Sequence, residues 1–402
     1  MSYIHDAERQ GGRRYASNTA AMNFMGSSGL GGLSWGLVAL LAMAALIGTA
    51  MLYSASQAGS AADADLWQRH LTRFGVGLFV MVILALVPLS IWFRLSYVVY
   101  LGALMLLVAV EFGGSIRGGA QRWLELGPIA IQPSEPMKVA LTLALARYYH
   151  SALAKVPVDA IRHHFMAALI VALPAALIFL QPDFGTTLAL VASGGVIVFL
   201  AGLRREVIGA FIVLGALSVP LVYTVVLEDY QRERVDTFIS QLSGGDESQS
   251  LSEGYQIEQA KIAIGSGGLT GKGYMQGTQT KLEYIPEQRT DFILTVIAEE
   301  LGFVGAAGLM TLWGIILVWC LFIASNCAER YGRYAAAGVA GTLAFYIVFN
   351  VGMVIGLLPV VGVPMPLVSY GGTAMMTIMV GFGLVLSADL HRDTRMPESP
   401  FL

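Results

Sequence analysis

The chain has 402 residues, of which 56% are hydrophobic and 13% charged, and its formal net charge is −3. With a mean hydropathy of +0.67 this composition excludes an ordinary soluble domain and indicates an integral membrane protein. The small net charge gives no reason to expect a nucleic acid partner, and two cysteines, Cys320 and Cys327, are too few for a disulfide framework or a thiolate metal site.

Residues 1–32 are polar and glycine-rich, without the short apolar core and cleavage site of a signal peptide, so they are expected to form a tail. A membrane span needs about 20 apolar residues. Runs that fit lie near residues 33–54, 73–93, 96–111, 135–150, 164–181, 184–202, 206–227, 303–325, 334–357 and 370–388. The sequence therefore predicts an all-α polytopic membrane protein, a bundle of about ten transmembrane helices.

Lys and Arg are concentrated in the loops on the same side as the N-terminus, which predicts that this side is cytoplasmic. The short loops on the opposite side are expected to hold Arg69, Arg73, Arg117 and Arg122, with Lys138 just inside a helix. The predicted organisation is a cytoplasmic N-terminal tail (1–32), a membrane domain (33–388) and a cytoplasmic C-terminal tail (389–402). A large extracytoplasmic loop, residues 228–302, joins predicted helices seven and eight.

That loop carries most of the polar chemistry. Residues 244–250 are typical of a mobile linker, and the apolar spacing of 255–264 predicts a short helix on the membrane surface. A single helix over 291–325 would be about 52 Å long, too long for a bilayer, so a break is expected near Gly302.

The loop contains a glycine-rich turn, GSGGLTGKG at 265–273. A nucleotide phosphate loop would need Gly and Ser or Thr where this chain has Ser266 and Gly273, so a nucleotide site is excluded. Either the turn is purely structural, or Lys272 contacts an anionic lipid head group.

Asp291 begins a helical pattern and has two interpretations. It can cap the helix N-terminus, or its carboxylate can act as a general base on a hydroxyl nucleophile while Lys281 and Arg289 hold a phosphate leaving group.

Ionisable residues at the edges of spans are further candidates. Glu135 and Lys138 are spaced for a local ion pair but can also belong to a site, and Asp183 can either cap a helix or bind a ligand. The proline-rich segment 357–373 cannot be a regular membrane helix, so it either lines a cavity, where Ser369 and Tyr370 can contact substrate, or folds back at the surface. The six histidines match no metal-ligand spacing.

Four segments resemble signatures of the SEDS family (shape, elongation, division and sporulation), in the same order. They are QRWLELGPIAIQPSEPMK, QPDFGTTL, YQIEQAKIAIGSGGLTGKGYMQGTQTKLEYIPEQRTDFILTVIAEELGFVG and GLLPVVGVPMPLVSYGG. The loop segment is most similar to the elongation branch of the family.

The resemblance implies a peptidoglycan glycosyltransferase that polymerises lipid II at the outer face of the bacterial cytoplasmic membrane during cell elongation. It also implies a partner, a class B penicillin-binding protein that crosslinks the product. The family's essential aspartate, in the motif TDFI, falls on Asp291, while Gln288 and Arg289 stand where many relatives carry histidine before TDF.

Matching motif positions make Arg122, Glu135, Lys138 and Asp183 candidate substrate-binding residues, and the other candidates are Lys272, Lys281, Glu287, Arg289 and Ser369. No cofactor is expected with certainty, although a divalent cation such as Mg or Mn is compatible with the chemistry. Two alternatives stay open: a lipid II flippase, and a non-catalytic membrane scaffold for a penicillin-binding protein.

Overall fold

The computed structural model describes residues 29–57, 63–117, 120–127, 129–152, 161–203 and 253–396, with scattered positions between 209 and 240. Within these ranges nine long helices correspond to nine of the ten predicted spans. They are α2 (Trp35–Gln57), α3 (Leu66–Leu86), α4 (Leu89–Gly113), α5 (Ser134–Ala152), α6 (Ile161–Leu180), α7 (Phe184–Leu200), α12 (Ile293–Asn326), α13 (Arg330–Val354) and α14 (Gly372–Leu390). Seven of them are long and apolar enough to cross a membrane, which confirms a polytopic helical protein.

Of the remaining two, α7 is apolar but shorter, and α5 carries charged residues. The predicted span 206–227 lies outside the continuously described ranges, and the linker 244–250 and residues 1–28 of the predicted tail lie outside the described residues altogether.

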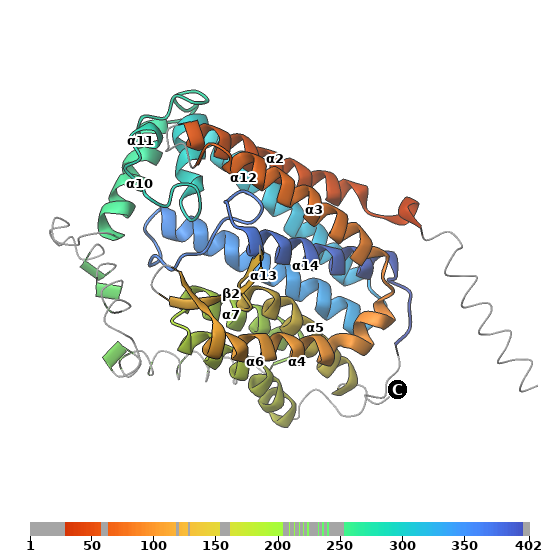
Figure 1. The fold of residues 1–402 in the computed structure, drawn as a ribbon. Coiled ribbons are helices and arrows are strands. Elements are labelled where there is room, and N and C mark those ends of the chain that lie inside the picture. Colours follow the sequence, from red (N-terminus) through yellow and green to blue (C-terminus); the bar gives the residue numbers. More distant parts are fainter. Residues whose placement is uncertain are drawn as a thin grey trace, which may run out of the picture.

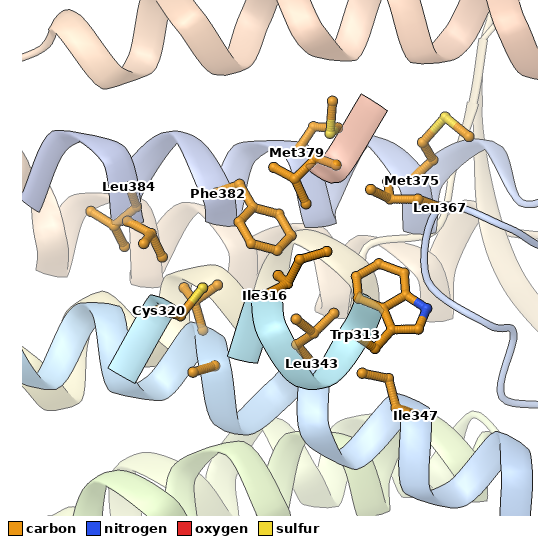
Figure 2. Close-up of a cluster of buried hydrophobic side chains, with 14 of the residues drawn as sticks. Trp313, Ile316, Cys320, Leu343, Ile347, Leu367, Met375, Met379, Phe382 and Leu384 are labelled. Carbon is orange, nitrogen blue, oxygen red and sulfur yellow. The ribbon is translucent and has the colours of Figure 1, made fainter. Parts of the chain in front are cut away.

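The helices pack around a continuous apolar core. Helix α14 lies along α3, and α13 packs against α5, α7 and α12 (Figure 1). Trp313 and Ile316 of α12 meet Leu343 of α13 and Phe382 of α14 in this core (Figure 2). The core therefore fixes α12, α13 and α14 relative to one another.

The predicted boundary between the second and third spans is wrong by several residues. The break lies at Val87 and Pro88. Helix α3 also begins earlier than predicted, at Leu66, so Arg73 lies inside it and not in a loop. A residue before proline is disfavoured from helical geometry, and Val87 is indeed extended, with ψ of 124°. The apolar pattern runs through this break, which is why hydrophobicity alone misplaced it.

The segment between α4 and α5 forms a small sheet that an all-α expectation misses. Strands β1 (Ser115–Arg117), β2 (Ala120–Leu126) and β3 (Ile129–Ile131) pair in order as an antiparallel sheet. This sheet brings Arg122 to the end of the helix bundle.

The break at Gly302 is confirmed, since this residue adopts φ 69° inside α12. Helix α10 (Glu253–Gly267) matches the predicted helix, but its apolar residues Ile257 and Ala260 are buried in the core and the helix packs on α12. Its apolar face is therefore covered by protein, where the sequence pattern had indicated the membrane surface.

The glycine-rich turn after α10 is held against the break in α12. Lys272 N donates to Glu299 O (3.0 Å), and Gly273 N donates to Glu300 O (2.9 Å). A Cβ on Gly271 would stand 2.1 Å from Glu300 O, so no larger residue fits there. The turn thus has a structural role, and it leads into the short helix α11 (Thr278–Lys281) and on to Asp291.

Candidate active site

A cavity of about 1410 Å³ opens between the small sheet and helices α3, α4, α5, α7, α13 and α14. Its charged lining residues in the described part of the chain are Arg73, Arg122, Glu135, Asp183 and Asp291. Apolar side chains of α4, such as Val99 and Leu106, form another part of its wall. The cavity therefore offers both charged groups and an apolar surface to one ligand.

Asp291 lies in this cavity, and its interpretation as a helix cap is wrong. Phe292 occupies the N-cap position of α12. The backbone carbonyl of Asp291 accepts a hydrogen bond from Asn350 Nδ2 (2.7 Å), which ties this residue to α13. Its Oδ2 is 3.3 Å from the point where a Cβ on Gly362 would stand, and Gly362 has φ 69°. Glycine there leaves space beside the carboxylate.

Segment 357–373 lines the cavity, the first of the two predicted alternatives. Gly362 and Pro364 contribute to the wall, as does Tyr370, whereas Ser369 does not. The Ser369 hydroxyl is buried and accepts from Met365 N (2.8 Å), so it stabilises the segment from behind.

Glu135 and Lys138 form the predicted ion pair, with Nζ 2.6 Å from Oε1, and both side chains are buried. The Tyr346 hydroxyl contacts both of them, and the Lys138 ammonium also lies over the Tyr346 ring. Glu135 reaches the cavity wall, while Lys138 lies behind it. The pair therefore presents little net charge to a ligand.

Replacing Lys138 with methionine is expected to lower the free energy of unfolding by about 3 kcal/mol, because a buried carboxylate would lose its cation. The double variant Glu135→Gln/Lys138→Met is expected to recover at least half of that loss. Thermal unfolding of the purified protein in detergent checks both. Arg392→Gln, which alters an exposed pair with Asp393, serves as control and should not change the midpoint. Equal destabilisation of the single and double variants would contradict the coupling.

Arg122 and Asp183 meet at the sheet end of the cavity. The guanidinium donates to Gln181 O (3.0 Å) and Pro182 O, and Nη1 lies 4.0 Å from Asp183 Oδ1. Asp183 also caps α7 by accepting from Thr186 N (3.2 Å), and it accepts from Gln132 Nε2 (2.8 Å). Asp183 therefore has its predicted role as a cap, and it also lies on the cavity wall, where its predicted role in ligand binding stays a prediction.

The other predicted cations are not brought to the cavity wall. Lys272 Nζ donates to Glu299 Oε1 (2.7 Å), and Arg289 binds Asp63 (3.1 Å) and Glu283. Lys281 is exposed and outside the lining.

Glu287 is also exposed and outside the lining, where it accepts from Thr290 Oγ1 (2.7 Å). The structure thus assigns Lys272 to an ion pair within the loop 228–302, and Arg289 to ion pairs with Glu283 of the loop and with Asp63, which precedes α3.

Sequence reasoning missed Arg73 as a site residue, although Arg73 lines the cavity, as does Tyr370, which the sequence had offered with Ser369 as a substrate contact. Arg73 Cζ lies 4.8 Å from the centroid of the Tyr370 ring. The only signal for Arg73 in the sequence was a lone arginine at the start of an apolar run. Because the start of the second span was predicted too late, Arg73 was assigned to a loop. Tyr370 N in turn donates to Arg289 O (2.9 Å), two residues before Asp291.

The cavity thus combines two arginines, an apolar wall and three carboxylates, of which Glu135 pairs with Lys138 and Asp183 lies near Arg122. The arginines and the apolar wall together can receive a ligand with an anionic group and a lipid tail.

Comparison with known proteins bears on this site. A sequence model of the FtsW/RodA/SpoVE family of cell cycle proteins matches residues 34–394. The chain is 41% identical over 356 residues to the peptidoglycan glycosyltransferase MrdB of Escherichia coli K12, covering 89% of this chain and 92% of that one. It is 32% identical over 363 residues to the stage V sporulation protein E of Bacillus subtilis, covering 88% and 96%.

Solved structures support the same family relationship. A chain of a peptidoglycan synthase complex, whose structure describes the coordination of polymerisation and crosslinking, superposes with a TM-score of 0.74 and 32% identity, covering 90% of this chain and 98% of that one. The rod shape determining protein RodA of Thermus thermophilus superposes with a TM-score of 0.67 and 30% identity, with the same coverage.

Proposed function

This chain belongs to the FtsW/RodA/SpoVE family and is a multi-pass membrane peptidoglycan glycosyltransferase, and from that premise we propose that it polymerises lipid II with Asp291 as the general base. The observation that carries the proposal is the position of Asp291 on the wall of the large cavity that Arg73, Arg122 and an apolar face of α4 also line. Relatives named for rod shape and for peptidoglycan synthesis support a role in cell elongation.

In the proposed reaction the Asp291 carboxylate takes the proton of the acceptor sugar's 4-hydroxyl. The hydroxyl oxygen attacks the anomeric carbon of the donor, forming the new glycosidic bond as the bond to the undecaprenyl pyrophosphate breaks. Attack opposite the leaving group inverts the anomeric centre and gives a β-linkage. The departing pyrophosphate carries away the electron pair and negative charge, which nearby arginines stabilise in a poorly solvated cavity.

The apolar wall formed by Val99 and Leu106 of α4 suits the polyprenyl chain, since moving an apolar chain from water onto an apolar surface is favourable. The charge distribution of the short loops supports cytoplasmic termini and an active site on the extracytoplasmic face of the bacterial inner membrane. The similarity to a chain of a synthase complex supports a partner that crosslinks the product, a class B penicillin-binding protein.

A divalent ion such as Mg or Mn has no three-residue site here, because no three His, Cys, Asp or Glu side chains converge in the described ranges. Such an ion would be held by one carboxylate together with pyrophosphate oxygens, as Mg²⁺ commonly is. Adding a chelator to the polymerisation assay tests this proposal directly.

The deciding experiment is polymerisation of labelled lipid II by the purified protein with its transpeptidase partner. Glycan strands should form when the transpeptidase site is blocked by a β-lactam, because polymerisation needs no crosslinking. In parallel, vesicles that contain the protein and lipid II on one leaflet measure transport. Transport without polymerisation would establish the flippase alternative, and polymerisation by the partner alone would establish the scaffold alternative.

A further inference from the structure

Arg73 is a cavity-lining cation that pairs with no carboxylate among the described residues. Of the two cations on the wall, Arg122 is held by two backbone carbonyls and lies near Asp183. In the described ranges Arg73 makes neither an ion pair nor a hydrogen bond. Its guanidinium lies over the Tyr370 ring. A half-buried guanidinium with five unused N–H donors is suited to receive an anion.

The position of Arg73 fits a ligand that reaches toward Asp291. Its guanidinium lies against the start of α14, where Cζ, Nη1 and Nε stand 3.1, 3.2 and 3.3 Å from the point that a Cβ on Gly372 would occupy. A side chain at residue 372 would therefore press on the guanidinium. Tyr370, which Arg73 stacks on, is hydrogen-bonded to Arg289 O (2.9 Å), close in sequence to Asp291. An anion at Arg73 would lie in the same cavity as the proposed base.

Stacking also fixes how the guanidinium can bind. A guanidinium held over an aromatic ring by its face retains its N–H donors for a ligand, and two of them can donate to one phosphate group. A pyrophosphate offers two such groups. Its negative charge would balance the positive charge of Arg73. The nearby ring restricts the rotamers of Arg73 before the ligand arrives, which reduces the entropy lost on binding.

We propose that Arg73 binds the pyrophosphate of the undecaprenyl-linked saccharide in this cavity. This inference rests on the proposed function, since it names the group of that substrate which Arg73 recognises. It assigns the role to Arg73 of α3. Lys272 and Arg289 are already paired with carboxylates, and Lys281 lies outside the cavity lining.

The test measures binding without turnover, using undecaprenyl pyrophosphate as the probe and the full-length protein in phosphatidylcholine nanodiscs. Arg73→Gln is expected to raise the Kd by about tenfold or more, as loss of a hydrogen bond to a charged group predicts. Arg73→Lys should recover part of the affinity, and undecaprenol, which has no phosphate, should bind both forms equally. Arg69→Gln, on an exposed position one turn earlier in α3, makes the same change of charge and should have no effect.

Unchanged binding of undecaprenyl pyrophosphate by Arg73→Gln would overturn the assignment. So would an equal loss of affinity for undecaprenol, which would indicate a collapsed cavity, or full displacement of the probe by excess phosphatidylglycerol, which would indicate a general anionic-lipid site.

Polymerisation kinetics separate this proposal from the proposed function. With lipid II and the partner, Arg73→Gln should lower kcat/KM by about tenfold or more, because Arg73 binds the pyrophosphate both in the bound substrate and as it departs. If the wild type binds the probe through Arg73 but forms no glycan strands, the proposed function fails and the anion site stands. If the wild type polymerises and Arg73→Gln has an unchanged kcat/KM, the proposed function stands and the assignment of the pyrophosphate to Arg73 fails.

Discussion

Asp291→Asn is expected to lower the rate of lipid II polymerisation by about 10²–10⁴-fold, the usual contribution of a general base. Asparagine has nearly the same shape but cannot accept the proton of the attacking hydroxyl. Asn350 bonds to the backbone carbonyl of residue 291, so the local fold should survive the change. Asp291→Glu keeps the carboxylate but moves it by one methylene, and should retain a small fraction of activity because a misplacement of about 1 Å is costly.

The measurement is strand formation by each variant with the partner present, under single-turnover conditions with saturating lipid II. Binding of undecaprenyl pyrophosphate should stay within about threefold of wild type, since the proposed base does not hold the leaving group. Glu287→Gln provides a matched control, an amide replacement at an exposed carboxylate of the same loop outside the cavity wall. Wild-type rates for Asp291→Asn would refute the base and favour transport or scaffolding.

Glu299→Ala is expected to lower the free energy of unfolding of the loop region by about 4 kcal/mol and to abolish measurable polymerisation, because several buried donors lose one acceptor. The carboxylate is fully buried and accepts from Lys272 Nζ (2.7 Å), Gln279 N (2.8 Å), Thr280 N (3.0 Å) and Thr280 Oγ1 (2.9 Å). These bonds hold α11 against α12.

The effect reaches the cavity through the chain between α11 and α12. Thr280 O accepts from Gln288 Nε2 (3.2 Å), three residues before Asp291. When α11 is released, the segment that carries Asp291 loses this support, so activity should fall along with stability.

Thermal unfolding and polymerisation assays check the prediction, and the midpoint should fall by at least about 5 °C. Glu258→Ala removes an exposed glutamate of α10 and should change neither quantity. The stability and activity of Glu299→Gln are expected to lie between those of Glu299→Ala and wild type, because its amide retains one oxygen acceptor but places an NH₂ against a backbone N–H. A Glu299→Ala variant that keeps full activity would show that α11 does not position Asp291.

Much of the fold follows from local sequence properties. Apolar runs located nine of the helices, and the length limit on a single span located the break at Gly302. The boundary at Pro88 was misplaced because hydrophobicity continues across it, although the proline itself was a local signal. The small sheet was missed because its strands are short and surrounded by glycine and proline.

The site was only partly predictable. Asp291, Arg122, Glu135 and Asp183 line the cavity as their motifs suggested, while Lys138 lies just behind it. Their roles could not be read from the sequence, since Asp183 both caps α7 and faces the cavity, whereas Phe292, not Asp291, is the N-cap residue of α12.

The sequence by itself therefore determined that this chain is a helical membrane protein, where most of its helices lie and which carboxylate is the best candidate base. Only the tertiary structure decided which cations face the cavity. Arg289 meets Asp63, and Lys272 meets Glu299, while Arg73 lies over Tyr370. Hydrophobicity and helix breaking are properties of neighbouring residues, but the charge that a ligand meets depends on partners far away in the chain, and folding alone brings those partners together.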